Sequence, residues 1–516
     1  MSTACAADED DVVEVIASHY LAAYALAPDA EDAAETKDKA RMTLAQAGDR
    51  AESLAAAAEA KRYFEQASEL TDDPTERAAL LDRAGEMAAR AGDPDGARNL
   101  FEESITLHEA QGDAHAAARV LLRLGRVDSR TGRRAEALAR GERAFSVISE
   151  DEPDEDLALL AARLSLDYWF TGDLERASER VELALDIAEA HGYPEALAIA
   201  LRAKTGVVHS RGHANEAEAL LKRGLEIALE HDLWDEAVTA YFWLSDRCFM
   251  RDAYADALGY QDESLALARK RGHRPYEWAI LAEQTYPLTM LGRWDEALAM
   301  SEEFTQEQVD AGGVMLSLLD SAVQIHVQQG DVDRALRVFS MFSRLEHSTD
   351  VQERAGYLAS RASLHLADAR PQEGLADGEA AVETMRTFGM SAQSAKHGIV
   401  TAIEAAFTLG DTAKLEELLT SIETLPRGTR PPYLDAQAKR FRARLGGDPA
   451  GYAAAAAGFR DLSLPFWLAV TQLEHGELTG DASLLAEARE IFERLEARPW
   501  LERLDAVAPT RTEVRA

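Results

Sequence analysis

The chain has 516 residues, of which 47% are hydrophobic and 28% charged, and its formal net charge is −37. A single core rarely grows to this length, so we expect several domains or a repeat array, and the composition excludes a disordered chain. So acidic a surface repels phosphate backbones and anionic lipid, which argues against nucleic-acid and membrane partners. The two cysteines, Cys5 and Cys248, are too few for a disulfide framework or a cysteine-ligated zinc site.

The N-terminal segment, residues 1–11, is acidic and has no apolar signal core. No apolar run approaches the ~20 residues that a membrane span needs. We therefore expect a cytoplasmic protein. We expect residues 1–30 to form an acidic segment and a capping helix, residues 31–425 a repeat array, and residues 426–516 degenerate repeats with a C-terminal cap.

The repeat is marked by a six-residue pattern that opens on Gly and closes on Ala, as in the run from Gly172 to Ala177. Six closing alanines lie 40 residues apart: Ala97, Ala137, Ala177, Ala217, Ala257 and Ala297. Asp252 opens a copy in which the Gly is lost. A second set of breaks, including Gly112, Gly192 and Gly272, lies halfway between, so each repeat has two punctuation points and two helices.

A small residue stands seven positions before each turn Gly, as Gly85, Ser165 and Thr205 show. A small side chain there lets the two helices of a pair approach closely, while larger apolar residues fill the shared core. The pattern predicts an all-α solenoid of about eleven helix–turn–helix pairs.

The run from Gly172 to Ala177, with Ser165 and Tyr168 before it and Ala184, Leu185 and Ile187 after it, resembles a tetratricopeptide repeat. The family's usual period is about 34 residues, so the 40-residue spacing implies longer helices. This longer variety is similar to the sensor arms of large bacterial signalling ATPases of the maltose-regulon activator type. The resemblance implies a superhelical scaffold that binds partners.

Segments near both ends carry a narrower resemblance. Residues 19–24, 62–67, 486–495 and 498–501 resemble the C-terminal helical region of actinobacterial AAA-ATPase proteins, many of which carry a class III adenylate cyclase domain. The dipeptide Gly-Lys is absent from the chain, so it has no Gly-x-x-x-x-Gly-Lys-Ser/Thr phosphate loop. The ATPase and cyclase activities do not carry over, and the chain is similar to the helical sensor arm alone.

No residue pattern indicates catalysis, a cofactor or a metal centre. His209 and His213 are four positions apart, but Gly212 breaks the helix between them. Cys248 occupies a core slot of the repeat, which favours a buried structural cysteine. We therefore expect a protein that is not an enzyme.

Two surfaces are candidates for partner binding. The first helix of each pair is expected to line the concave face of the superhelix. Its aromatic, Met and charged residues are of the kinds that anchor partners. Packing of the same residues against neighbouring helices is the alternative. The predicted groove consists of Leu166, Trp169, Phe170, Arg202, His209, Phe242, Asp246, Phe249, Met250, Tyr286 and Met290.

The second candidate is an arginine stripe with helical spacing, formed by Arg119, Arg123, Arg126 and Arg130. It suits an acidic segment or a phosphorylated ligand, unless its residues pair with carboxylates of adjacent helices.

These observations favour a non-catalytic scaffold in bacterial signal transduction or transcriptional regulation, which binds a protein, peptide or small effector along its concave face. The alternative is a sensor subunit or fragment of an ATP-dependent signalling enzyme that acts with a separately encoded ATPase or cyclase. The sequence does not indicate the partner's identity or the oligomeric state.

Overall fold

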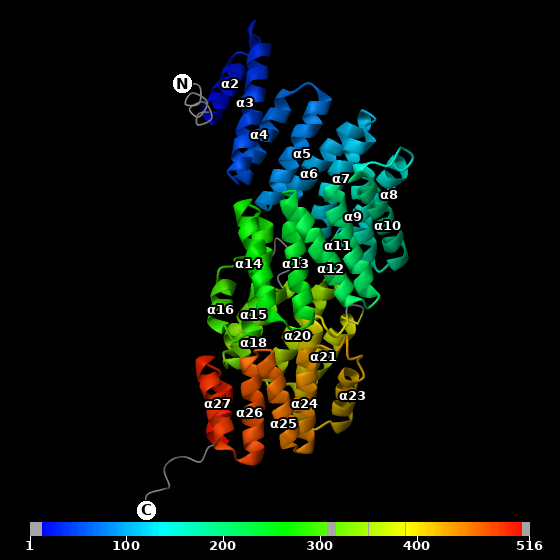
Figure 1. Ribbon diagram of the computed structural model, residues 1–516. Helices are drawn as coiled ribbons and strands as arrows, with labels where there is room; N and C mark the ends of the chain where they lie inside the picture. The colour runs from blue at the N-terminus through cyan, green and yellow to red at the C-terminus, as the bar shows by residue number, and fades with distance from the viewer. Residues whose placement is uncertain are drawn as a thin grey trace, which may run out of the picture. The chain divides into compact units, whose positions relative to one another are not determined.

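The computed structural model describes residues 13–131, 133–306, 309, 316–348, 350–386 and 389–507. These residues form helices joined by short turns, and no strand occurs among them (Figure 1). The chain divides into two compact units. Unit 1 comprises residues 1–241 and 263–278, and unit 2 comprises residues 242–262 and 279–516.

Unit 1 is built from consecutive antiparallel helix pairs. Its helices are α2 (Val13–Leu26), α3 (Ala33–Ser53), α4 (Ala57–Leu70), α5 (Pro74–Ala91), α6 (Pro94–Ala110), α7 (Ala114–Arg130), α8 (Arg134–Ile148), α9 (Glu155–Thr171), α10 (Leu174–His191), α11 (Pro194–Ser210) and α12 (Ala214–Glu230). Three further helices contribute residues to both units: α13 (Trp234–Met250), α14 (Tyr254–Lys270) and α15 (Arg274–Met290).

Unit 2 continues the same arrangement with shorter second helices. Its helices are α16 (Trp294–Glu302), α18 (Leu316–Gln328), α19 (Val332–Met341), the 3₁₀ helix η1 (Ser343–His347), α20 (Val351–Ala367), α21 (Pro371–Thr384), α22 (Gln393–Leu409), α23 (Thr412–Glu423), α24 (Pro432–Gly446), α25 (Pro449–Asp461), α26 (Pro465–Thr479), α27 (Ala482–Arg494) and α28 (Arg498–Val507). The all-helical, tetratricopeptide-like solenoid predicted from the sequence is therefore confirmed.

The Gly-Asp signature of the repeat has a local cause at each turn. Gly172 ends α9 in the left-handed conformation with φ 85°, which a residue without Cβ adopts at little cost. Asp173 then caps α10, because its carboxylate accepts a hydrogen bond from the backbone N–H of Arg176 at 3.1 Å. One dipeptide thus ends the first helix and starts the second.

The small position and the closing alanine form the crossing point of each pair, as predicted. Ser165 and Ala177 are both fully buried, and the Ser165 hydroxyl donates a hydrogen bond to the Ala177 carbonyl at 2.7 Å. The Thr205 hydroxyl occupies the same place, 3.2 Å from the carbonyl of Ala217 and 2.9 Å from that of Leu201 in its own helix. At Gly85 an added Cβ would lie 2.6 Å from the Phe101 ring, so no larger side chain fits there. Cys248 is fully buried, as its core slot in the repeat predicts.

Within each unit, the turn of one pair also packs against the start of a first helix five pairs further along the chain. In unit 1, a Cβ on Gly92 would lie 3.3 Å from the Trp278 ring. In unit 2, a Cβ on Gly292 would lie 2.5 Å from Pro465, and one on Gly330 would lie 3.0 Å from Pro499. Successive superhelical turns therefore contact one another inside each unit.

Asp252 replaces the turn Gly in the degenerate copy and takes a positive φ of 60°. It is only 1% exposed, and its two carboxylate oxygens have separate partners. One accepts a hydrogen bond from Lys396 Nζ at 2.6 Å, and the other accepts one from the backbone N–H of Tyr433 at 2.8 Å. These long-range bonds hold a backbone conformation that is unfavourable for an L-residue.

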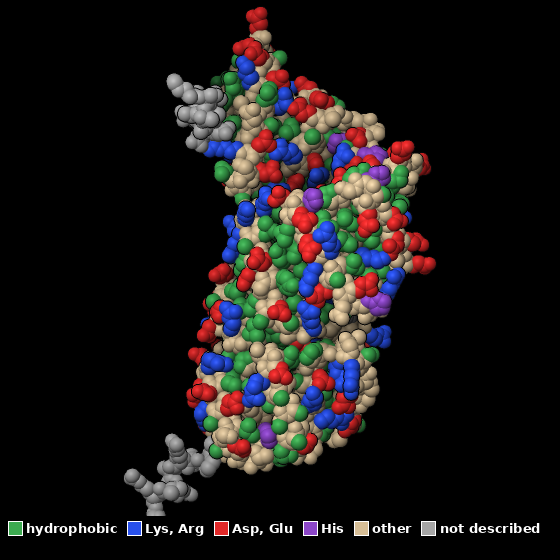
Figure 2. Space-filling view, in the orientation of Figure 1, with side chains coloured by type: hydrophobic (Ala, Val, Ile, Leu, Met, Phe, Trp, Pro, Cys, Tyr) green, Lys and Arg blue, Asp and Glu red, His purple; other side chains and the backbone are tan. Residues whose placement is uncertain are grey.

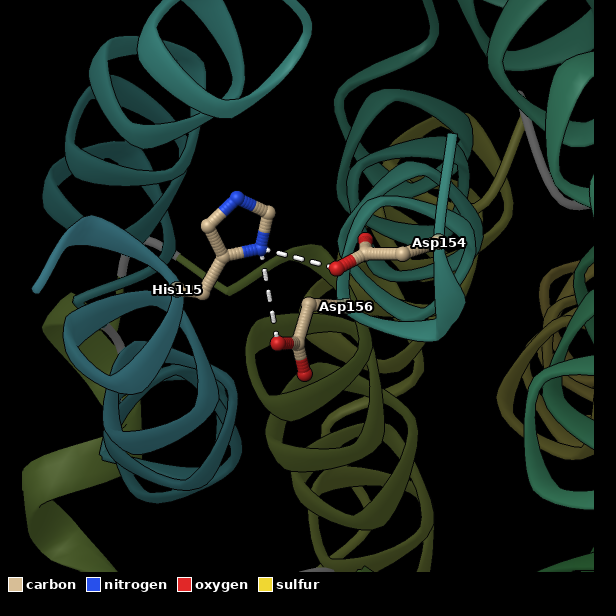
Figure 3. Close-up of side chains that lie close together, drawn as sticks. All are labelled: His115, Asp154 and Asp156. Carbon is tan, nitrogen blue, oxygen red and sulfur yellow. Dashed lines mark ion pairs between the residues drawn. The ribbon is translucent and has the colours of Figure 1, made fainter. Parts of the chain in front are cut away.

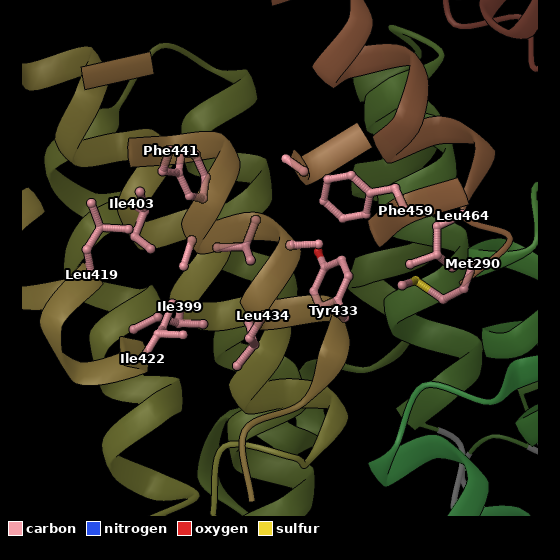
Figure 4. Packing of buried hydrophobic residues seen from close by; sticks show 14 of the residues in the cluster. Met290, Ile399, Ile403, Leu419, Ile422, Tyr433, Leu434, Phe441, Phe459 and Leu464 are labelled. Atoms are coloured by element: carbon pink, nitrogen blue, oxygen red, sulfur yellow. The ribbon is translucent and has the colours of Figure 1, made fainter. Parts of the chain in front are cut away.

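The largest core of unit 2 lies beside this ion pair (Figure 4). Ile399 and Ile403 of α22 pack with Leu434 and Phe441 of α24, and Tyr433 points toward Phe459 of α25. The loop between α23 and α24, residues 424–431, leads directly into this core.

We predict that Gly398→Ala lowers the free energy of unfolding by about 1–3 kcal/mol, because the new methyl overpacks a backbone crossing. A Cβ at Gly398 would lie 2.9 Å from the carbonyl oxygen of Gly378, which cannot rotate away. Gly259→Ala, in α14, is the matched control, since a Cβ there meets nothing within 4 Å. It should stabilise the chain by about 0.5–1 kcal/mol. Urea denaturation followed by circular dichroism checks both, and equal shifts for the two variants would contradict the close crossing.

Candidate functional site

The arginine stripe lies on α7 in unit 1, and each described guanidinium of it contacts a carboxylate. Arg119 Nη1 lies 2.5 Å from Asp156 of α9, and Arg123 Nη1 lies 3.0 Å from Asp82 of α5. Arg126 Nη1 reaches Asp235 of α13 at 3.1 Å. The side chain of Arg130, the fourth predicted member, lies outside the described residues.

A pocket of about 370 Å³, counting the space open to solvent, adjoins Arg123 and Arg126. Its walls come from α5, α6, α7, α13 and the turn before α15, all of unit 1. The residues that line it are Glu86, Ala89, Arg90, Phe101, Arg123, Arg126, Val127, Asp235 and His273. Three arginines and two carboxylates give this lining a net charge of +1 (3 − 2) with His273 neutral, although the chain as a whole carries −37.

Arg90 completes the cationic wall from α5. Its Nη1 lies 3.1 Å from Glu52, and its guanidinium lies 4.7 Å from the centre of the Trp234 ring. An arginine over an aromatic face is held in place while its edge remains able to donate hydrogen bonds.

Neighbouring carboxylates keep Arg126 charged in spite of its burial. Burial opposes the charged form, but Asp235, Glu236 and Glu86 outweigh it and raise the pKa of Arg126. For Asp82 the order is reversed: burial raises the pKa of its carboxyl more than Arg123 lowers it. The three arginines of this surface therefore stay charged, and each is paired with at least one carboxylate of a neighbouring helix.

Guanidinium donors exceed acceptors at this surface. Each arginine has five N–H donors. The one hydrogen bond found for the Arg126 side chain, among the described residues, joins Nη1 to Asp235. An incoming carboxylate or phosphate can take up the remaining donors in a bidentate contact. Figure 2 shows that basic and acidic side chains are interspersed over the drawn face, as on an ordinary solvated surface.

The predicted groove residues divide between the two units. In unit 1, Leu166 is buried and Arg202 is buried against Glu236, with Nη2 at 2.8 Å from the carboxylate. Trp169 is half-buried and donates a hydrogen bond from Nε1 to Ser210 at 2.9 Å. His209 and Phe170 are also half-buried, and the Arg134 guanidinium lies 3.9 Å from the centre of the Phe170 ring.

In unit 2, three of the predicted groove residues lie in the core. Phe249, Tyr286 and Met290 are 8%, 3% and 7% exposed and belong to the cluster of Figure 4. The Tyr286 ring packs edge-on against Phe249, with centroids 5.6 Å apart. The other three, Phe242, Asp246 and Met250, are half-buried.

Asp246 belongs to a pair of acids inside unit 2. Burial raises the pKa of Asp246 to about 7, and the nearby Arg247 lowers it only in part. Burial also raises the pKa of Glu283, on α15, to about 8, with a further contribution from the charge of Asp246. Burial therefore keeps both carboxyls partly protonated near neutral pH, and the charge of Asp246 adds to this effect at Glu283.

A chain of polar side chains continues from Glu283. Ser317 donates a hydrogen bond to Glu283 at 3.0 Å and lies 3.1 Å from Gln393 Oε1. The Gln393 amide donates to Asp320 at 2.9 Å, and Asp320 also contacts His397. Burial acts to raise the pKa of Asp320, but His397 and the hydrogen bonds lower it overall. The chain links α15, α18 and α22.

The repeat spacing in the sequence could have indicated some of the inward-facing charged residues described above. Arg126, Glu86 and Asp246 occupy one column of the 40-residue repeat, since 126 − 40 = 86 and 126 + 3 × 40 = 246. Charged residues therefore occupy this position in three repeats, while Leu166, Gly206 and Tyr286 occupy it in the others. Asp235 and Trp234 gave no such signal, because their contacts with α7 and α5 depend on superhelical curvature.

Comparison with known proteins identifies the repeat. Residues 76–150 match the tetratricopeptide repeat family, so this region, which holds most of the arginine surface, is of that class. No curated protein sequence matches the chain.

Among solved structures, the Rap protein complexed with Competence and Sporulation Factor is 12% identical, with a TM-score of 0.48, and the match covers 70% of this chain and 100% of that one. BtubC from P. vanneervenii is 15% identical over 44% of this chain and 91% of its own, with a TM-score of 0.35. A signal-transduction ATPase with a tetratricopeptide repeat sensor, from Pyrococcus horikoshii, is 13% identical over 76% of this chain and 55% of its own, with a TM-score of 0.43. These likenesses concern the fold alone.

Within the described part of the chain, every helix is too short or too polar to cross a membrane.

We predict that Glu283→Gln reduces the loss of stability with rising pH. The folded-state pKa values of Glu283 and Asp246 lie above the ordinary values near 4. The folded chain thus binds more protons than the unfolded chain between about pH 4 and 8, and stability falls as pH rises through that window. Glutamine keeps the acceptor for Ser317 and should stabilise the chain at pH 8.5 by on the order of 1–3 kcal/mol.

Urea denaturation at pH 5.5 and 8.5 measures this difference. Glu490→Gln, which removes an exposed carboxylate of α27, is the control and should keep the wild-type pH dependence. If wild type, Glu283→Gln and Glu490→Gln all lose stability in parallel, the acid pair does not titrate as described.

Proposed function

We propose that this chain is a non-catalytic scaffold that binds an acidic or phosphorylated segment of a partner protein on the arginine surface of unit 1. The arginine surface comprises Arg90, Arg123 and Arg126 around the open pocket described above. The observation that carries the proposal is this locally cationic pocket in a chain of net charge −37.

The chemistry of the arginine surface favours an acidic side chain of a peptide over a nucleic-acid backbone. Long-range repulsion from the acidic chain acts on any anionic partner, but it disfavours nucleic acid, with its many phosphates, more than a peptide with a few acidic groups. A carboxylate or phosphate presented on a peptide can pair with two guanidiniums at the open side of the pocket at short range. Phe101 and Val127 line the same pocket and offer apolar contact to the stem of the incoming side chain.

The biological setting we propose is bacterial signal transduction or transcriptional regulation. Support comes from the resemblance of the long repeat to the sensor arms of signalling ATPases. The segments 19–24 and 486–495 support the second candidate, a sensor subunit that acts with a separate ATPase or cyclase. In that case the isolated chain binds no ATP, and a catalytic subunit gains activity when the chain is added.

We predict that the double variant Arg123→Gln, Arg126→Gln weakens binding of acidic peptides at least tenfold. Each lost charge-assisted hydrogen bond is worth about 1.5–3 kcal/mol, which corresponds to tenfold or more. Fluorescence anisotropy with matched pairs of peptides, one carrying serine and the other phosphoserine in an acidic context, measures the change. The phosphorylated member should bind more tightly to wild type, and the preference should vanish in the double variant.

Arg143→Gln is the matched control, because Arg143 is an exposed arginine of α8 in the same unit. It should bind like wild type, and circular dichroism should show equal helicity for all three proteins. Unchanged binding by a folded double variant, or preferential binding of basic peptides by wild type, would overturn the proposal.

A further inference from the structure

An acidic loop joins α8 to α9 in unit 1 and meets a single imidazole. The segment from Glu150 to Asp156 contains six acidic residues and one proline. His115, near the start of α7, points at it between Asp154 and Asp156 (Figure 3). His115 Nδ1 lies 2.9 Å from Asp154 Oδ2 and 3.5 Å from Asp156 Oδ2. One ligand atom from each of the three residues lies within 4.8 Å of the others.

The second ring nitrogen of His115 has its own partner. Nε2 lies 3.2 Å from Asp151 Oδ2, within hydrogen-bond distance. In the tautomer that donates Nε2–H to Asp151, Nδ1 carries a lone pair and faces two carboxylates, which are acceptors as well. Nδ1 is screened from solvent and makes no hydrogen bond of acceptable geometry. Such a convergence of acceptors is stabilised either by a proton, which makes His115 an imidazolium, or by a metal ion between the three groups.

We propose that His115, Asp154 and Asp156 bind a divalent transition-metal ion of the zinc class. Imidazole with carboxylates suits Zn²⁺, whereas Ca²⁺ and Mg²⁺ prefer oxygen ligands alone. Bonds of about 2.05 Å in a tetrahedron separate neighbouring ligand atoms by about 3.3 Å. The distances of 2.9 and 3.5 Å from Nδ1 bracket that value.

The surrounding residues fit the roles that such a site needs. A carboxylate on the far nitrogen of a metal-binding histidine fixes its tautomer and orientation, and Asp151 occupies that place. Asp154 is held at the start of α9, where it accepts a hydrogen bond from the backbone N–H of Leu157 at 3.0 Å. The fourth position is left for water, as in sites with three protein ligands.

Arg119 is the competitor of the metal ion. Its Nη1 lies 2.5 Å from Asp156 Oδ2, the same oxygen that faces His115. The ion must displace this guanidinium, which is half exposed and free to swing into solvent. A bound ion would cross-link α7 to the α8–α9 loop.

Titration of the untagged full chain with Zn²⁺, by calorimetry and by the visible absorption of Co²⁺ as a substitute, tests the site. We expect His115→Ala to weaken binding at least tenfold and Asp151→Asn to weaken it about tenfold. Asp154→Asn should also weaken binding while it preserves the helix cap, since asparagine caps as well as aspartate. Arg119→Gln should strengthen binding, a gain that general damage to the fold cannot produce.

His213→Ala is the matched control, because His213 is an exposed histidine that contacts one carboxylate, Glu216, at 3.1 Å. It should bind Zn²⁺ like wild type. Equal affinity of wild type and a folded His115→Ala variant would overturn the proposal, and so would Ca²⁺ binding as tight as that of Zn²⁺. In either case the imidazole is held by its carboxylates as a protonated ion pair only.

Discussion

The packing of a turn against the start of a helix five pairs later is the constraint on which each unit depends. A turn can accept that neighbour only if it has little or no side chain, as at Gly92 and Gly292. The neighbour brings a proline, which has no backbone N–H to leave unsatisfied at the first turn of a helix. These contacts close the superhelix on itself, so its interior is filled by side chains. Side chains that would line an open groove in a linear array are therefore part of the hydrophobic core in these units.

This closure decides where the chain can bind something. In unit 2 the inward-facing aromatic residues are buried. Its interior also holds the hydrogen-bonded polar side chains that run from Glu283 to Asp320, and the raised pKa values of Asp246 and Glu283 show that burial disfavours their ionised forms. In unit 1 the inward face of α7 keeps guanidiniums beside a pocket, because carboxylates of α5 and α13 reach them without filling the space. The binding chemistry that we propose thus rests on guanidinium N–H donors that the scaffold's own carboxylates leave unused, while those carboxylates hold the arginines in place for an external acid.

The local fold could be predicted from the sequence, because its determinants are local. A Gly-Asp pair ends one helix and caps the next, and Ser165 and Ala177 mark a crossing whatever the rest of the chain does. The candidate site could be predicted only in part. The spacing of Arg119, Arg123 and Arg126 identified their common face, but Asp235 is 109 residues from Arg126. That contact depends on the curvature of the superhelix. The curvature is the sum of small rotations between successive repeats, and the spacing of residues in the sequence does not show it. The same missing quantity led the groove prediction to include Phe249, Tyr286 and Met290.

The buried link from Asp252 to Lys396 and Tyr433 has a consequence for the order of folding. Repeat arrays commonly fold by adding one neighbour at a time, since each repeat contacts only those beside it. Here a charge near the start of unit 2 stays without its partners until the chain up to Tyr433 has been made and folded back. The entropy cost of closing this long loop comes before the stabilising contact can form. Unit 2 should therefore be completed late in synthesis and as one cooperative body, whatever its repeats achieve separately.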